Sequence, residues 1–100
     1  MLSKKTKYAL LAMIALAKEP QGNPTMIASL AKNERIPKKF LELILLDLKS
    51  LGVVQSRKGK HGGYYLSRSP DEIRLGQIIR GIEGDMQAII AMDAGRMQDV

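Results

Sequence analysis

The chain has 100 residues, a net charge of +6 at pH 7 and no cysteine. This length suits one domain with a single core, and without cysteine a disulfide, a thiol nucleophile or a thiolate-held metal cluster is excluded. Residues 1–70 contain 13 Lys or Arg against 4 Asp or Glu, whereas residues 71–100 contain 3 against 6. A basic body of this kind indicates a polyanionic partner.

A first helix is expected from Ser3 or Lys4 to about Lys18, with Ser3 as its N-cap and Pro20 at the exit. Apolar residues lie on nearly all its sides, which is typical of a buried central helix. Its apolar run, residues 8–17, is too short to span a membrane, and no secretory cleavage site follows it. We therefore expect a cytoplasmic protein with no membrane partner.

Two further helices are expected, joined by a short turn. Asn23-Pro24-Thr25 predicts the start of the second, over Thr25 to Lys32, with Asn23 or Thr25 as the cap. Pro37 opens the third helix, and Gly52 fits the left-handed residue that ends it. The apolar residues of the third helix recur at the spacing of one buried stripe. They are Phe40, Leu41, Ile44, Leu45, Leu48 and Leu51.

The stretch from Gly52 to Leu66 predicts a β-hairpin with a cationic tip. Glycines at 59, 62 and 63 allow the positive φ values that a tight turn needs. Two short helices followed by a basic hairpin form a winged helix-turn-helix, a mainly α fold with a two-stranded β wing. A solvated surface turn is the alternative interpretation of the tip. The side chains expected to project from it are Arg57, Lys58, Lys60 and His61.

A turn over residues 68–72 precedes a further short amphipathic helix. Gly81 and Gly84 weaken this helix and are expected to end it. Its apolar positions are Leu75, Ile78, Ile79 and Ile82.

Four blocks of the sequence resemble bacterial winged helix-turn-helix transcriptional regulators of the IscR/NsrR/CymR type, and together they cover about residues 1–84. The first two are Leu2-Ser3-Lys4-x-x-Lys7-Tyr8-Ala9-Leu10 and Ile36-Pro37-x-x-Phe40-Leu41-Glu42. The third is Gly52-Val53-Val54-x-Ser56-x-Lys58-Gly59-x-x-Gly62-Gly63-Tyr64-x-Leu66. The fourth is Ile73-x-Leu75-x-x-Ile78-Ile79-Arg80-x-x-Glu83-Gly84.

The resemblance implies a homodimeric regulator, and specifically a repressor, bound to a palindromic site on double-stranded DNA. The helix over residues 37–51 would enter the major groove, and the wing over residues 57–63 would reach the backbone or the neighbouring minor groove. Residues 1–84 would be the DNA-binding domain, and residues 85–100 a C-terminal tail or the start of a dimerisation helix. Many such regulators hold an iron–sulfur cluster through three cysteines after the fourth block. This sequence has none, so no cofactor is expected.

The candidate DNA contacts at the two helix starts are cations placed against the helix dipole. Lys4, Lys5 and Lys7 open the first helix, where contact with DNA phosphate or a plain solvated face would explain them. Lys38 and Lys39 open the third helix, and on the resemblance they occupy the exposed part of the recognition helix.

Two further positions carry a choice of role. Glu42 could accept a hydrogen bond from a cytosine amine or pair with a neighbouring lysine. Lys58 stands where related regulators often have Arg, and Lys lacks the planar fork that fits a narrow groove. Arg57 would substitute only if the strand register presents it outward.

Other functions are less well supported by the residues. The glycine-rich tip lacks the Gly-Lys-Ser/Thr ending of a phosphate loop, and no arrangement of catalytic side chains predicts an enzyme. His61 is the sole histidine and has no partners for a metal site. Two alternatives stay open, because fold does not fix function. One is a winged-helix module that binds protein, and the other is an effector pocket near residues 85–100.

Overall fold

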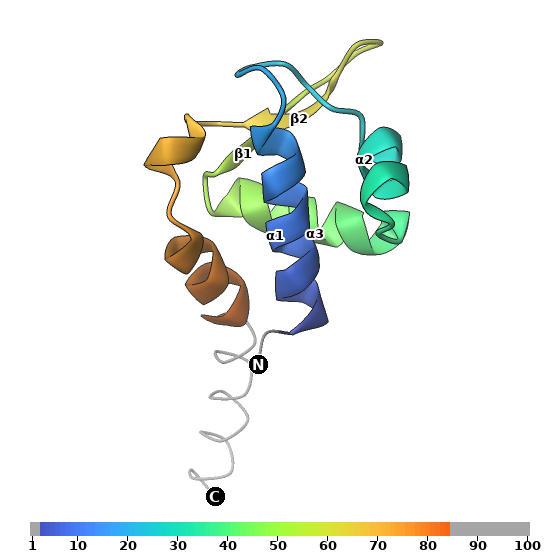
Figure 1. Cartoon of the computed structure of the whole chain (residues 1–100). Helices are drawn as coiled ribbons and strands as arrows, with labels where there is room; N and C mark the ends of the chain where they lie inside the picture. The colour runs from blue at the N-terminus through green and yellow to red at the C-terminus, as the bar shows by residue number, and fades with distance from the viewer. Residues whose placement is uncertain (1–2, 85–100) are drawn as a thin grey trace, which may run out of the picture.

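The computed structural model describes residues 3–84 (Figure 1). Three helices are followed by a two-stranded antiparallel sheet, so the predicted class, mainly α with a β wing, is confirmed. The labelled elements are α1 (Lys4–Ala17), α2 (Ile27–Glu34), α3 (Lys38–Ser50), β1 (Val54–Arg57), β2 (Gly63–Leu66) and the short 3-10 helix η1 (Pro70–Glu72).

Helix α1 is the central element, packed against α2, α3 and β2 (Figure 1). Ser3 caps it as predicted, because its Oγ accepts a hydrogen bond from the backbone N–H of Thr6 at 3.1 Å. Ala9 and Ala12 are fully buried on its inner side. Their small side chains let neighbouring elements approach the helix closely.

Helix α2 begins at Ile27, so the prediction of a start at Thr25 was wrong. The backbone N–H and C=O of Thr25 each bond to Tyr64 of β2, both at 2.8 Å. Thr25 therefore forms a one-residue β-bridge beside β2 and cannot be part of a helix. Met26 occupies the N-cap position and forms no side-chain cap.

Helix α3 follows the sequence expectation closely. Pro37 stands at its N-cap, and Gly52 adopts the left-handed conformation just beyond its end, with φ of +80°. Four residues of the predicted stripe are 0% exposed and form the centre of the core, while Phe40 and Leu51 are half-buried beside it. The four are Leu41, Ile44, Leu45 and Leu48.

The wing is the hairpin of β1 and β2, paired from Val54 with Leu66 to Arg57 with Gly63. Gly59 and Gly63 have φ of +112° and +151°, as predicted. The same prediction was wrong for Gly62, which has no positive φ. A Cβ atom there would lie 2.1 Å from the carbonyl oxygen of Arg57, so Gly62 is needed for close approach within the turn.

The chain is helical again over residues 75–84. Ile78 and Ile82 complete the core, with 0% exposure. The prediction that the helix ends at Gly81 was wrong, because the helix continues through this residue. A Cβ atom at Gly81 would lie 2.6 Å from the Leu51 methyl groups, so the glycine lets Leu51 pack against the helix. The predicted tail over residues 85–100 lies outside the described residues. Between residues 3 and 84, no helix is long and apolar enough to cross a membrane.

Candidate nucleic-acid interface

The face of α3 opposite the buried stripe is exposed to solvent. Lys39, Leu43, Leu46 and Ser50 follow one another along it at spacings of four, three and four residues. The two leucines are 58% and 56% exposed, although they belong to the same helix as the core leucines. The flanks of this face carry the exposed side chains of Lys38, Glu42 and Lys49.

The start of α1 and the start of α3 meet around a shallow hollow. The Tyr8 ring packs edge-on against Phe40, with centroids 5.5 Å apart. Lys4 places its ammonium 5.9 Å from the Tyr8 ring centre, and Lys39 and Leu43 line the same hollow. The fold thus brings two candidate cations, Lys4 and Lys39, from separate segments to one surface.

Lys5 has a different position from its neighbours on α1. Its ammonium forms an ion pair with the Asp47 carboxylate of α3, and both side chains are about one third exposed (28% and 30%). The pair joins the two helices and neutralises one of the two carboxylates on α3. Lys4 and Lys7 remain exposed beside it.

The wing presents its cations to solvent. Arg57 lies on the exposed side of β1, so the register does present it outward, and its guanidinium sits 5.6 Å from the centre of the Tyr65 ring. One residue before Arg57 on the same strand, Ser56 accepts a hydrogen bond from the Lys49 ammonium of α3 at 2.8 Å. At the tip itself, Lys58, Lys60 and His61 are all exposed.

Sequence reasoning missed a polar connection between the two ends of the described chain. The Glu83 carboxylate accepts hydrogen bonds from the Thr6 hydroxyl at 2.6 Å and from the Ser3 backbone N–H at 3.2 Å. The Thr6 hydroxyl, and then the Ser3 N–H, hold the pKa of Glu83 below its usual range. The only available signal was Thr6 itself, a polar residue in an apolar helix three positions after its cap. This contact fixes the α1 start that carries Lys4 and Lys7.

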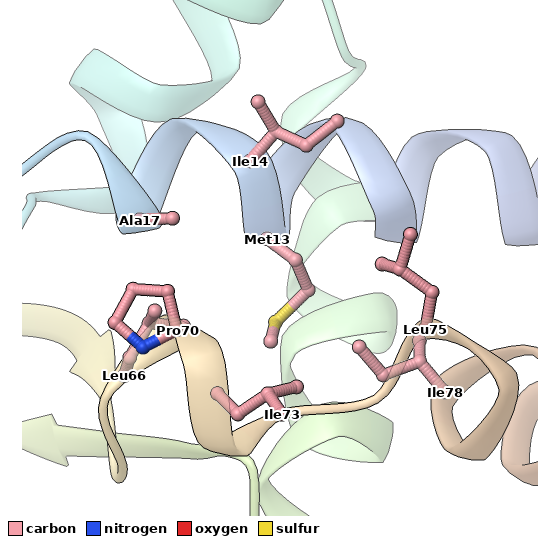
Figure 2. A pocket seen from close by; sticks show the side chains of 8 residues that line it. All are labelled: Met13, Ile14, Ala17, Leu66, Pro70, Ile73, Leu75 and Ile78. Carbon is pink, nitrogen blue, oxygen red and sulfur yellow. The ribbon is translucent and has the colours of Figure 1, made fainter.

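A second hollow, of about 190 Å³, lies away from these cations, between α1, β2 and the helix over residues 75–84 (Figure 2). Figure 2 shows Met13 and Ile73 pointing into it from opposite sides. All its lining residues are apolar, including Ile14 and Leu75 at the rim. It offers no polar side chain to orient a ligand.

Helix α3 in the place of a recognition helix, followed by a basic hairpin, defines a winged helix-turn-helix protein. The chain belongs to the Rrf2 family, described as "Iron-dependent Transcriptional regulator", which matches residues 2–99. This confirms the predicted resemblance to regulators of the IscR, NsrR and CymR type. The family and its relatives are transcriptional regulators and not enzymes, as predicted.

Named relatives and solved structures agree with the family. CymR of Bacillus subtilis is 36% identical over 92 residues, which are 92% of this chain and 67% of that protein. NsrR of B. subtilis is 32% identical, over 95% of this chain and 65% of that protein. The structure of B. subtilis CymR, "the Global Cysteine Regulator", matches with a TM-score of 0.80 and 39% identity over 84% of this chain and 65% of that one. T. potens IscR matches with a TM-score of 0.79 and 28% identity, over 99% of this chain and 77% of that one.

The chain spans 52% to 67% of the length of the curated relatives it matches. The family description mentions iron, but the residues present do not fit a thiolate-held cluster, because the sequence has no cysteine. Within residues 3–84, no three His, Cys, Asp or Glu side chains lie together in a way that could hold a metal ion.

Proposed function

We propose that the chain binds double-stranded DNA as a sequence-specific transcriptional regulator, with α3 in the major groove and the wing on the adjacent backbone or minor groove. The observation that carries this proposal is the exposure of cations from three separate segments: the start of α1, the start of α3 and the wing. On α3, Asp47 is paired with Lys5, and Glu42 forms no ion pair with any side chain of residues 3–84. A polyanion is the partner that such a surface fits.

The start of α3 supports the placement of this helix against DNA. Pro37 forms no side-chain cap, and the first turn of α3 contains Lys38 and Lys39 with no acidic residue. The positive end of the helix dipole and two ammonium groups therefore lie together, which is unfavourable unless an anion compensates them. A DNA phosphate supplies that anion and fixes the register of the helix on the duplex.

In this proposal, the wing binds the phosphate backbone of the DNA. Its exposed cations surround a glycine turn, and no Asp or Glu lies between residues 57 and 63. Arg57 has the planar fork that Lys58 lacks, and it is exposed, so it supplies the arginine that related regulators have one position later. His61 adds a donor at the tip.

The proposed assembly is supported by the family likeness and by interface size. A single DNA-binding module buries only about 600–1,000 Å² of protein surface, and two copies on one site double that contact. We therefore infer a homodimer on a palindromic operator. A cytoplasmic location and a repressor role complete the proposal. With no cysteine in the sequence, its response does not pass through the cysteine-held cluster of many relatives.

The test reverses charge on the proposed contact surface. The Lys38→Glu/Lys39→Glu double variant should bind a random-sequence duplex at least about tenfold more weakly than wild type, measured by fluorescence anisotropy at constant salt. Lys18→Glu is the control, because Lys18 is an exposed lysine at the opposite end of α1. Because Lys18→Glu reverses one charge and the double variant reverses two, a loss in log affinity half as large in Lys18→Glu would show that only net charge matters. A wild-type chain with no duplex affinity would favour the protein-binding alternative.

A further inference from the structure

Two leucines of α3 are exposed next to each other on the outward face of the helix, three residues apart. Leu43 and Leu46 point directly away from the core stripe, and neither belongs to the apolar core cluster. More than half of each side chain is open to water. They therefore contribute little to holding α3 in place, and their chemistry is available to a partner.

The surroundings of the leucines identify the kind of partner. Lys39 precedes Leu43 by one turn on the same face, and Lys38 and Lys49 lie on its flank. The result is an apolar strip with a cation at its start and two cations on one flank, where Glu42 also lies. The major groove of DNA has the complementary layout: phosphates run along both edges, and the thymine C5-methyl groups lie on the floor.

We propose that Leu43 and Leu46 determine sequence specificity by packing against thymine methyl groups in the major groove. The inference rests on the proposed DNA-binding function and deepens it. Three residues of helix rise about 4.5 Å, and base pairs are stacked every 3.4 Å or so. The two leucines therefore contact neighbouring base pairs, and each half-site should contain thymine at two adjacent or nearly adjacent positions.

The experiment begins with selection of duplexes from a random library by the wild-type chain. Thymines in the selected site are then replaced one at a time by deoxyuridine, which removes only the methyl group. At the contacted positions, wild type should lose about three- to fivefold in affinity per methyl group. Leu43→Ala and Leu46→Ala should each lose about the same factor with thymine, and each should be insensitive to deoxyuridine at its own position. Such non-additivity is the signature of a direct contact.

Leu75→Ala is the matched control, because Leu75 is 55% exposed but lies on the helix over residues 75–84. It should keep wild-type affinity and wild-type sensitivity to deoxyuridine, and thermal unfolding checks that every variant is folded. Selective binding by wild type without a deoxyuridine effect would overturn this inference and leave the DNA-binding proposal standing. Additive losses in the leucine variants would also overturn it. A chain without duplex affinity would overturn both proposals.

Discussion

Helix α3 and the wing both present cations to solvent, but their support differs. α3 rests on four core residues with 0% exposure, and its C-terminal half is tied to α1 by Lys5–Asp47 and to β1 by Lys49–Ser56. The wing rests on two strands of four residues each, joined by a glycine turn. A helix held on a close-packed core can keep side chains in a fixed register. A hairpin tip needs only to place charge near a phosphate.

The outward face of α3 and the tip of the wing also differ in amino-acid composition. The outward face of α3 combines cations with leucines and a carboxylate, which are groups that distinguish one base edge from another. The tip of the wing, residues 58–62, contains only lysine, glycine and histidine. Under the proposed function, this difference favours sequence discrimination by α3 and sequence-independent affinity from the wing.

The largest expected effect comes from the support of α3. Leu45→Ala removes a fully buried side chain and should lower the free energy of unfolding by about 2–5 kcal/mol. Its neighbour Leu46 is 56% exposed, so Leu46→Ala should change that free energy by no more than about 0.5 kcal/mol. Urea unfolding of both variants measures the difference. Equal losses would contradict the orientation of α3.

The support of the wing gives the next effect. A Cβ atom on Gly63 would lie 2.3 Å from the Thr25 carbonyl oxygen, so Gly63→Ala should disrupt the bridge from residue 25 to β2. We expect a loss of about 1–3 kcal/mol in urea unfolding. Gly76→Ala is the control, because Gly76 has open space in a helix and alanine there is favourable. A Gly63→Ala variant with wild-type stability would show that residue 25 and β2 are not tightly packed.

Replacing single cations with alanine should separate the roles of α3 and the wing. Lys60→Ala and Lys39→Ala should each reduce the slope of log affinity against log salt by about 1. Lys60→Ala should leave the ranking of duplex sequences unchanged, whereas Lys39→Ala should alter it. Binding of a panel of duplexes checks both. Uniform losses in the two variants would remove the distinction between α3 and the wing.

The smallest effect concerns the contact that holds the α1 start. The folded protein lowers the pKa of Glu83, so its stabilising contribution is complete at neutral pH. It is lost as the pH falls from about 4.3, the ordinary value for glutamate, through the folded pKa. Glu83→Gln should melt at a lower temperature than wild type at pH 7, and this difference should shrink steadily as the pH falls below about 4.3. A constant difference across this range would show that the carboxylate charge is unimportant.

The sequence predicted the features that depend on local pattern. The spacing of apolar residues located the buried stripe of α3, and the glycines with their cations located the wing. The features it missed depend on distant partners. The start of α2 was wrong because Thr25 pairs with Tyr64, and Gly81 is a packing position only because Leu51 lies against it.

The candidate interface was predictable in part for the same reason. Its cations are exposed, as their charge suggests, but the pairing of Lys5 with Asp47 depends on how α1 crosses α3. The sequence analysis did not predict that Leu43 and Leu46 are exposed, because leucine in an amphipathic helix is ordinarily assigned to the core. Only the angular position opposite the stripe identifies them as outward.

The most direct test of the central claim is the salt dependence of duplex binding by the 100-residue chain. Seven proposed contacts are exposed cations, and each phosphate contact adds about −0.9 to the slope of log affinity against log salt. Contact by four of them in one protomer predicts a slope of about −3.6 or steeper between roughly 50 and 200 mM salt. The absence of binding at the lower concentration, or an affinity that does not change with salt, would contradict DNA binding.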